Sequence, residues 1–309
     1  MEKLKILITG GNGFLGVNII NALLKNKFDV VVLEKNRNFT SKLSHFTNDI
    51  KIFFSDDNDL EEIFRTNNIH SILHCATNYG KSGLNSEVIE TNILMPIKLL
   101  ELCKKYEVKY YINTDTFYNK VGNEDYTFLR EYIKSKKHIC DWLKLSSYNE
   151  IRILNMKLEH IYGPDDNADK FVPMIIKKLM NNEKEINLTF GEQKRDFIFV
   201  DDVVSAFIFA INNIDKFHTG YNELSVGTSK VITIKEFVMT AKNIIDSKSI
   251  LNFGKLPYRD NEIMFSSAKL SSLQENGWKS IISLKEGLKK IIEFEKNRQN
   301  ELIKTDNKF

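Results

Sequence analysis

The sequence predicts an α/β protein built on a doubly wound parallel sheet, with a smaller C-terminal α/β lobe. Short apolar runs alternate with segments of helical periodicity, and a glycine-rich turn joins the first apolar run to the first helical segment. Strands and helices that alternate at this spacing form parallel sheets with helices on both faces. Ligands bind such sheets at the carboxyl ends of the strands, so polar residues that follow a strand are the candidates for function.

The stretch 4–16, LKILITGGNGFLG, contains a strand, a glycine loop and the start of a helix. Gly10 can turn the chain sharply, Gly13 lets backbone amides approach a phosphate, and Gly16 lets the helix pack closely on the strand. A helix N-terminus aimed at this loop favours an anion, here a dinucleotide pyrophosphate. The spacing G-x-x-G-x-x-G is weak evidence alone, and the strand before it and the helix after it favour the dinucleotide interpretation.

The later periodic segments complete the predicted fold. Strands are expected at 30–33, 51–57, 71–77, 108–114 and 151–158, and helices at 59–67, 88–106 and 131–143. Beyond Asp165 the pattern is less regular, with a helix near 172–180, strands at 195–200 and 221–228, and helices after Asp201 and over 232–245, the last with Thr233 as N-cap. We therefore expect a Rossmann-type dinucleotide-binding domain over 1–164, to which 187–220 returns, and a substrate-binding lobe over 165–309.

Composition excludes several classes of function. The 309 residues are 42% hydrophobic and 28% charged, and the net charge of +3 is too small and too dispersed to predict a nucleic-acid partner. Cys75, Cys103 and Cys140 lack metal-ligand spacing, so no metal site is predicted. No signal-peptide pattern and no apolar run of membrane-spanning length occur, so we expect a soluble, cytoplasmic protein with no membrane partner.

Glu34 ends the second predicted strand, eighteen residues after Gly16. A carboxylate there can accept hydrogen bonds from the adenosine ribose hydroxyls and would repel a 2′-phosphate, which favours NAD. Lys35 and Arg37 follow directly and could instead bind that phosphate. The cofactor is therefore predicted as NAD(P)H, with NAD favoured by Glu34 and NADP left open.

Tyr132 and Lys136 lie four residues apart on a predicted helix, which places both side chains on one face. A nearby ammonium is expected to lower the pKa of the phenol toward the working pH, as a proton donor to a sugar oxygen requires. Thr114 ends a strand at the edge where ligands bind, and its hydroxyl can orient a substrate oxygen. Tyr and Lys at this spacing usually form only an exposed helix face, and the position after this strand is what favours catalysis.

Several motifs, in order over nearly the whole chain, resemble the extended short-chain dehydrogenase/reductase family, in its NAD-dependent epimerase/dehydratase group. They are TGGNGFLG, Asp56, ILHCAT, Asn92, INTDTFYN, Tyr132-x-x-x-Lys136, IYGP and RDFIFVDDV. The resemblance implies a nucleotide-sugar substrate and a catalytic triad of Thr114, Tyr132 and Lys136. The cofactor-binding residues that it implies, with those argued above, are Gly10, Gly13, Phe14, Leu15, Gly16, Glu34, Lys35, Arg37, Asp56, Asp57, Ala76, Asn92, Tyr132 and Lys136.

The resemblance also implies substrate contacts. Arg195 and Arg259 match the arginines that contact the diphosphate and ribose in this group, and a guanidinium suits that role because it binds diphosphate bidentately. His160 stands where many relatives have Asn before the YGP turn; it either contacts the substrate or is a buried, hydrogen-bonded histidine. Thr116 stands where 4,6-dehydratases carry a glutamate that removes the C5 proton, so dehydration is not expected.

The segments INTDTFYNK, KLEHIYGP and LPYRDNEIMF resemble those of the CDP-abequose and CDP-paratose synthases. These enzymes are 4-ketoreductases of nucleotide-linked deoxysugars. We therefore expect NAD(P)H-dependent reduction of the C4 keto group of a nucleotide-diphospho-4-keto-deoxyhexose. A 4-epimerase with tightly bound NAD is the enzymatic alternative, and a non-catalytic dinucleotide sensor is a third. The family commonly forms homodimers through the Tyr132 helix, whose apolar residues could equally face the core.

Overall fold

The computed structural model describes residues 3–39, 41–56, 59–120, 126–146 and 151–306. The chain divides into two compact units. Unit 1 comprises 1–158, 204–226 and 270–278, and unit 2 comprises 159–203, 227–269 and 279–309.

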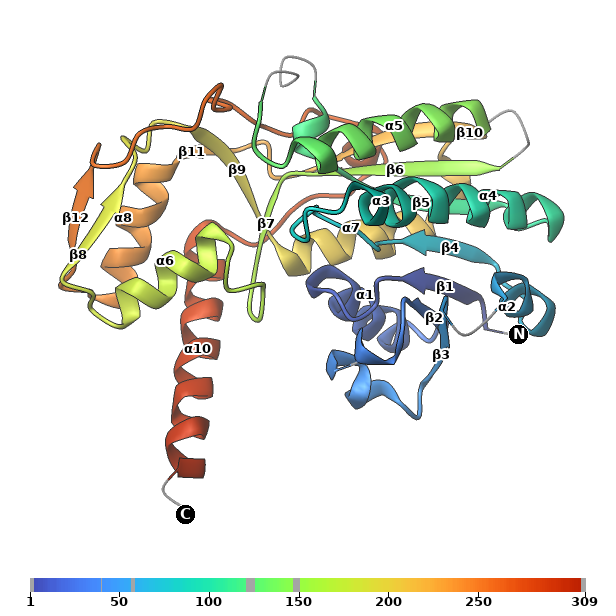
Figure 1. The fold of residues 1–309 in the computed structure, drawn as a ribbon, viewed down its shortest axis with the longest axis horizontal. Helices are drawn as coiled ribbons and strands as arrows, with labels where there is room; N and C mark the ends of the chain where they lie inside the picture. Colours follow the sequence, from blue (N-terminus) through green and yellow to red (C-terminus); the bar gives the residue numbers. More distant parts are fainter. Residues whose placement is uncertain (1–2, 40, 57–58, 121–125, 147–150, 307–309) are drawn as a thin grey trace. The chain divides into compact units, whose positions relative to one another are not determined.

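Unit 1 is organised around a seven-stranded sheet with the order β10-β6-β5-β4-β1-β2-β3, in which all neighbours pair in parallel (Figure 1). Its strands are β1 (Lys5–Thr9), β2 (Asp29–Glu34), β3 (Ile50–Phe54), β4 (Ser71–His74), β5 (Tyr110–Thr116), β6 (Arg152–Leu158) and β10 (Gly220–Val226). The strand order reverses at β1, since β2 lies on one side of it and β4 on the other. The predicted doubly wound parallel sheet is confirmed.

Helices cover both faces of this sheet, which is why its strands are apolar runs rather than alternating ones. The helices and helical turns of unit 1 are α1 (Phe14–Lys25), η1 (Arg37–Phe39), η2 (Ser41–Phe46), α2 (Leu60–Thr66), α3 (Asn85–Ile89), η3 (Glu90–Leu94), α4 (Met95–Lys105), η4 (Phe117–Asn119), α5 (Arg130–Ser146), the greater part of α7 (Val200–Asn212), η5 (Ile214–Lys216) and α9 (Ser272–Glu275). Figure 1 shows α4 and α5 on one face and α1 and α7 on the other.

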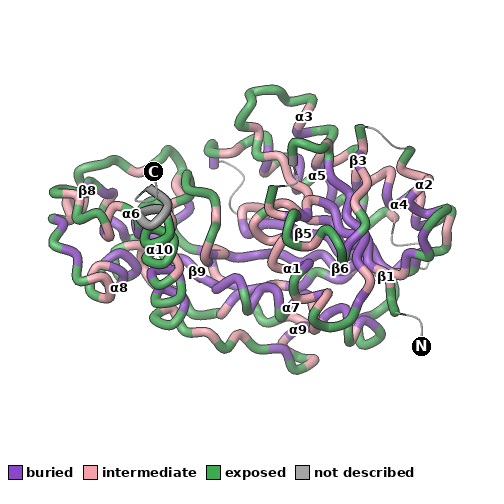
Figure 2. The backbone as a smooth tube through the Cα atoms, turned by 90° about the horizontal axis from the view of Figure 1, so that it is seen from below, coloured by how far each residue is buried: buried purple, intermediate pink, exposed green. Residues whose placement is uncertain are grey.

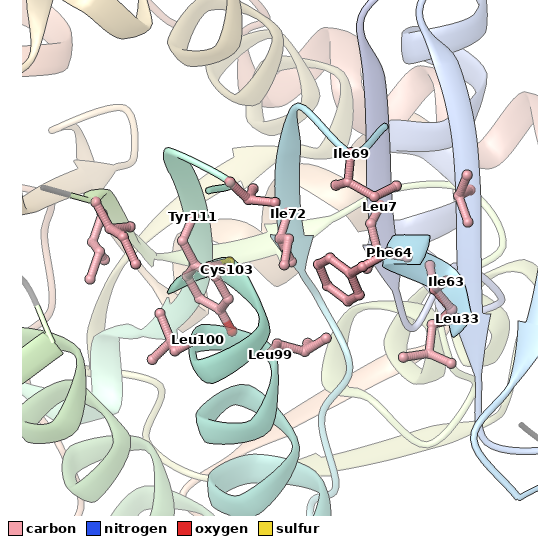
Figure 3. Close-up of a cluster of buried hydrophobic side chains, with 14 of the residues drawn as sticks. Leu7, Leu33, Ile63, Phe64, Ile69, Ile72, Leu99, Leu100, Cys103 and Tyr111 are labelled. Carbon is pink, nitrogen blue, oxygen red and sulfur yellow. The ribbon is translucent and has the colours of Figure 1, made fainter. Parts of the chain in front are cut away.

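A buried cluster fills the space between the sheet and α2, α4 and α5. Leu7 and Tyr111 contribute from the strands, and Phe64 and Leu99 contribute from α2 and α4 (Figure 3). Leu7, Leu99 and Tyr111 are fully buried, and the buried residues of the sheet form a continuous band (Figure 2). This core holds the strand ends, and therefore the polar residues that follow them, in fixed positions.

The predicted single helix over 88–106 is three segments, because a π-helical turn, η3, separates α3 from α4. Pro96 lies at the start of α4 and has no N–H to donate to the carbonyl of Asn92, four residues earlier. The wider turn accommodates that loss. As a result, Asn92 is turned inward and is 1% exposed.

Unit 2 contains two small sheets and three longer helices. The sheets have the orders β11-β9-β7 and β12-β8, and β9 pairs in parallel with β7 and antiparallel with β11. The elements are β7 (His160–Tyr162), α6 (Phe171–Met180), β8 (Glu185–Leu188), β9 (Lys194–Phe199), β11 (Val231–Thr233), α8 (Ile234–Ile245), β12 (Ile250–Phe253) and α10 (Leu284–Asp306). The predicted N-cap at Thr233 is present as a capping box with Glu236.

The units divide the chain differently from the expected boundaries. The segment that returns to unit 1 is 204–226, followed by 270–278, rather than 187–220. The reason is that β9 pairs with β7 and β11 in unit 2, whereas β10 adds to the edge of the large sheet beside β6. The sequence pattern identifies these strands but not their partners.

Candidate active site

The glycine loop joins β1 to α1 with the predicted conformation at its two critical positions. Gly10 has φ +67°, and a Cβ there would lie 2.7 Å from the backbone of Ala76. A Cβ on Gly16 would overlap the carbonyl oxygen of Gly10. Gly10 and Gly16 are therefore packed too closely for any larger residue, as predicted for the approach of the helix to the strand.

The N-terminus of α1 is suited to bind an anion. Gly13 is the N-cap and has no side chain to cap the helix, and the first turn, which begins at Phe14 and Leu15, carries no acidic residue. Backbone N–H groups at an uncapped helix N-terminus bind phosphate. The loop thus fits the pyrophosphate of a dinucleotide.

Glu34 is buried against the glycine loop and accepts a hydrogen bond from it. Its side chain is 7% exposed, and its Oε1 accepts a hydrogen bond from the backbone N–H of Asn12 at 2.8 Å. Burial raises the pKa of this carboxyl to about 7, and backbone hydrogen bonds from Asn12 and Gly11 oppose that shift. A contact between Glu34 and a ribose remains a prediction.

The other predicted residues at the adenosine end lie near Glu34. Lys35 is exposed, and the guanidinium of Arg37 lies 4.7 Å from the centre of the Phe54 ring. Asp56 accepts a hydrogen bond from Asn36 Nδ2 at 3.2 Å. Asp57 lies outside the described residues. These positions leave the choice between NAD and NADP to experiment.

The four predicted residues of the catalytic end lie together. Tyr132 and Lys136, from α5, are 6% and 2% exposed. Lys136 Nζ donates a hydrogen bond to the Thr114 carbonyl at 2.9 Å, and the Thr114 hydroxyl donates to the His74 carbonyl at 3.1 Å. The side chain of Thr116 opposes the rise in the pKa of the Tyr132 phenol that burial causes.

The expected lowering of the Tyr132 pKa is wrong. Burial raises the pKa of Tyr132 well above its ordinary value, and the neighbouring Tyr79 and Asp115 add to that rise. Burial also lowers the pKa of Lys136, and Asp115 opposes this shift. The ammonium of Lys136 bonds the Thr114 carbonyl. Helical spacing suggested that this ammonium would lower the pKa of Tyr132, but the effect of burial on that pKa is larger. Tyr132 is thus a neutral phenol that carries a proton at neutral pH.

Asn92 organises the loop after β4 and the catalytic helix. Its Oδ1 accepts from the N–H of Asn78, and its Nδ2 donates to the carbonyl of Asn78 and to Ser135 Oγ, each at 2.8 Å. Ser135 Oγ donates in turn to the carbonyl of Tyr132 at 2.7 Å. The predicted cofactor contact of Asn92 remains a prediction, and the structure gives its amide a positioning role that the sequence did not suggest.

Two further residues of this region escaped the sequence analysis. The ring of Tyr79 lies 4.8 Å from that of Tyr132, measured between centroids. Asp115, whose side chain is fully buried, accepts from Asn155 Nδ2 at 3.0 Å and lies 3.9 Å from Lys157 Nζ. Both follow or end strands at the ligand-binding edge, which is the signal that could have found them.

The predicted substrate residues Arg195, Arg259 and His160 belong to unit 2. Arg195, on β9, forms a buried ion pair with Glu262 at 2.8 Å. The N–H of Glu262 bonds the carbonyl of Arg259, so the pair ties β9 to the turn that carries the second arginine. His160, on β7, packs against Phe197 with ring centroids 5.7 Å apart. Sequence spacing gave no indication of Glu262 as a partner.

The described part of the chain contains no group of three His, Cys, Asp or Glu residues that could hold a metal ion. In the same residues, no helix has the length and apolar character needed to cross a bilayer.

The chain is similar to known proteins in sequence and in fold. The model of the NAD dependent epimerase/dehydratase family matches residues 6–227. The chain is 36% identical to a CDP-abequose synthase from Salmonella muenchen, over 93% of this chain and 97% of the relative. It is 27% identical to a putative UDP-glucose 4-epimerase from Methanocaldococcus jannaschii, over 94% and 98%. The UDP-glucose 4-epimerase of Thermotoga maritima, solved with UDP-glucose, has the same fold, with TM-score 0.81, 23% identity, and coverage of 96% and 100%.

Proposed function

The chain belongs to the NAD-dependent epimerase/dehydratase family, and from that premise we propose that it reduces the C4 keto group of a nucleotide-diphospho-4-keto-deoxyhexose with NAD(P)H. The observation that carries the proposal is the buried group of Thr114, Tyr132 and Lys136, in which Lys136 Nζ donates to the Thr114 carbonyl at 2.9 Å. The similarity to CDP-abequose synthase supports CDP as the nucleotide.

Tyr132 donates its proton to the C4 oxygen as that oxygen becomes an alkoxide. The nicotinamide, when bound, supplies the hydride that C4 receives. The phenol carries its proton at neutral pH and gives it up once negative charge develops on the substrate oxygen. The hydroxyls of Thr114 and Thr116 orient the sugar oxygen, and Lys136 supplies positive charge that stabilises the phenolate left after transfer.

Thr116 is also the reason to exclude dehydration from the proposal. A hydroxyl is too weak a base to remove the C5 proton, for which dehydratases of the family use a glutamate. Arg195 and Arg259 bind the diphosphate in the proposal, with Glu262 orienting Arg195. His160 contacts the substrate beside them.

A nucleotide-sugar 4-epimerase is the second candidate, favoured by the similarity to the M. jannaschii protein. It would use the same three residues with a tightly held NAD. An epimerase should be purified with bound NAD and need no added cofactor, whereas a reductase consumes NAD(P)H in proportion to product.

The test is to incubate the protein with CDP-, dTDP-, GDP- and UDP-linked 4-keto-6-deoxyhexoses and either NADH or NADPH, and to follow loss of nicotinamide absorbance. The proposal expects oxidation with at least one pair and identifies the preferred nucleotide and cofactor. No oxidation with any pair would contradict it.

We also propose that the protein is a cytoplasmic homodimer that associates through α5. Ile139 lies in the core, whereas Trp142 on the same helix is 44% exposed and available to a second copy. Light scattering after size exclusion, on the native chain and on Trp142→Glu, tests this: the substitution is expected to give monomers, and an unchanged mass would contradict the proposed surface.

A further inference from the structure

We propose that Asp115 is a positioning residue of the reaction: its buried carboxylate supplies the negative charge beside which Lys136 remains an ammonium ion. Lys136 is needed in that form, because a neutral amine has no charge with which to stabilise the phenolate of Tyr132. This role rests on the proposed function. It belongs to a side chain that escaped the sequence analysis.

Asp115 follows Thr114 on β5, and the carbonyl of Thr114 accepts the hydrogen bond from Lys136. That carbonyl and the N–H of Asp115 belong to one peptide unit, so the bond of 2.9 Å places the ammonium within about 6 Å of the Asp115 Cα. The side chain of Asp115 is fully buried, and Lys136 is 2% exposed. Solvent screens such buried charges little, so the carboxylate acts strongly on the ammonium.

The groups around the carboxylate of Asp115 are hydrogen-bond donors and a cation. Asn155 Nδ2 donates to Oδ2 at 3.0 Å, and Asn119 Nδ2 donates to Oδ1 at 3.4 Å. Lys157 Nζ lies 3.9 Å from Oδ2. A neutral carboxyl would have to donate its own proton, and none of these three nitrogen atoms accepts one. These partners favour the ionised form and oppose burial, which raises the pKa of Asp115.

Asn155 is held in the orientation that this arrangement requires. Its Oδ1 accepts a hydrogen bond from Asn113 Nδ2 at 2.7 Å, so its Nδ2 is the end that faces Asp115. Asn113 and Asn155 are fully buried, and the register of β5 and β6 pairs these two residues and pairs Asp115 with Lys157. The position of the carboxylate is therefore fixed by the neighbouring strand.

Helix α5 packs the turn that follows Lys136 against the same group of residues. Cys140 lies one helical turn after Lys136, on the same face of the helix. Its Sγ accepts from Asn119 Nδ2 at 3.4 Å and from Asn155 Nδ2 at 3.6 Å. These are the two amides that bond Asp115. The face of α5 that carries Lys136 is thus the face that packs on the surroundings of Asp115.

Other titratable groups that act on Lys136 carry no charge at neutral pH. Burial lowers the pKa of His74, on β4, to about 3, and it raises the pKa values of Cys75 and Cys140 well above the ordinary value of a thiol. Burial lowers the pKa of Lys136, and Asp115 opposes that shift more than the two thiols do. The protonation of Lys136 therefore depends mainly on Asp115.

The experiment compares wild type with two uncharged variants, Asp115→Asn and Asp115→Ser, both of which can still accept a hydrogen bond from Asn155. The matched control is Asp215→Asn, which removes a carboxylate that pairs with Arg152 at the opposite end of β6 from Lys157. Magnetic resonance of protein labelled in lysine follows the Nζ signal of Lys136, assigned with Lys136→Met, from about pH 6 to about pH 10. Turnover is measured over the same range, and thermal unfolding identifies the pH values at which each variant is folded.

We expect Lys136 to be protonated at neutral pH in wild type and in Asp215→Asn. In the two Asp115 variants the pH at which Lys136 loses its proton falls by about 1 to 2 pH units, because the negative charge that favours the ammonium is gone. Their kcat is then about tenfold or more below wild type at high pH and within about threefold of it at low pH. A defect in structure alone would lower kcat by the same factor at every pH.

An unchanged titration of Lys136 in the Asp115 variants would overturn the inference while the proposed reduction stands. A Lys136 that is already neutral at pH 7 in wild type would also overturn it, and that result needs no variant. Asp115 raises the pKa of Tyr132 as well, so kcat responds to both groups and the Nζ signal is what identifies Lys136. If wild type oxidises NAD(P)H with no sugar nucleotide, the proposed reduction fails, and the Nζ titration still decides whether Asp115 keeps Lys136 protonated.

Discussion

The two ends of the cofactor site in unit 1 are built in different ways. The adenosine end is centred on one continuous stretch, β1, the glycine loop and α1, in which missing side chains let backbone approach backbone, and Glu34 of β2 bonds this loop. The catalytic end consists of β5, α5 and the loop after β4, held by buried side chains from separate segments. The first end depends on glycines, which have no side chain, within one short segment. The second end depends on contacts between residues that are far apart in the sequence.

Burial favours the neutral form of an ionisable side chain at both ends. It raises the pKa of Glu34 to about 7 and lowers that of Lys136, so each group is pushed toward its neutral form. At the adenosine end, backbone N–H groups oppose the shift, and at the catalytic end the carboxylate of Asp115 does so. Substitutions should therefore affect affinity and stability at the first end and turnover at the second.

The largest effect is expected for Tyr132→Phe. Removing the phenolic hydroxyl removes the proton donor, and kcat should fall by about 10²- to 10⁴-fold while the affinity for cofactor stays within about threefold. Steady-state kinetics and cofactor titration on the same preparation measure both. Full turnover by the variant would contradict the catalytic assignment.

At the adenosine end, Gly16→Ala places a Cβ on the carbonyl oxygen of Gly10, so the loop must move. We expect a loss of about 1–3 kcal/mol in the free energy of unfolding and weak cofactor binding. Gly13→Ala is the matched control, since its Cβ would lie 3.2 Å from the same oxygen and requires only a small shift. An equal loss in the free energy of unfolding in the two variants would argue against close packing as the role of Gly16.

Asn92→Ala removes the amide that links the loop to the catalytic helix. We expect a cost of about 1–3 kcal/mol in stability, because buried backbone groups of Asn78 lose their partners, and a fall in kcat of about tenfold or more as Tyr132 loses its support. Asn67→Ala removes another buried amide, one that bonds the Ile63 carbonyl and the Thr66 hydroxyl. That control should lose stability and keep kcat. A similar kcat in both variants would show that the Asn92 clamp has no catalytic consequence.

The most gradual effect concerns the pH dependence of stability. The pKa of Glu34 is about 7 in the folded protein, above its ordinary value of 4.5, so the folded state binds the proton more tightly. The free energy of unfolding should therefore fall as pH rises from about 4.5 to about 7, by at most about 1.4 kcal/mol per pH unit from this group. Glu34→Gln should remove that part of the slope, as denaturant titrations at several pH values would measure. An identical slope in the variant would contradict the buried carboxyl.

The same comparison explains what the sequence could predict. Gly10 and Gly16 act through their own backbone and their immediate neighbours, so their spacing sufficed. Tyr132 and Lys136 are one helical turn apart on α5, and the sequence sufficed to place both on this helix. The sign of the Tyr132 pKa shift was predicted wrongly, because helical spacing gives the distance to a charge but not the depth of burial.

Contacts between distant segments escaped prediction. Asn92 bonds residues 14 and 43 positions away, and those contacts depend on a π-helical turn that local propensity does not specify. Arg195 and Glu262 are 67 positions apart. Tyr79 stands in a loop with no periodicity, and only the packing of α5 against that loop brings it to Tyr132.

The most direct test of the proposed reduction uses NADH or NADPH carrying deuterium at the transferred position of the nicotinamide, with the nucleotide-linked 4-keto sugar as acceptor. Nuclear magnetic resonance of the product locates the label, and absorbance gives the amount of cofactor oxidised. We predict deuterium at C4 of the sugar and one nicotinamide oxidised per product molecule. Conversion of the sugar without cofactor oxidation, or a label at any other carbon, would contradict reduction at C4.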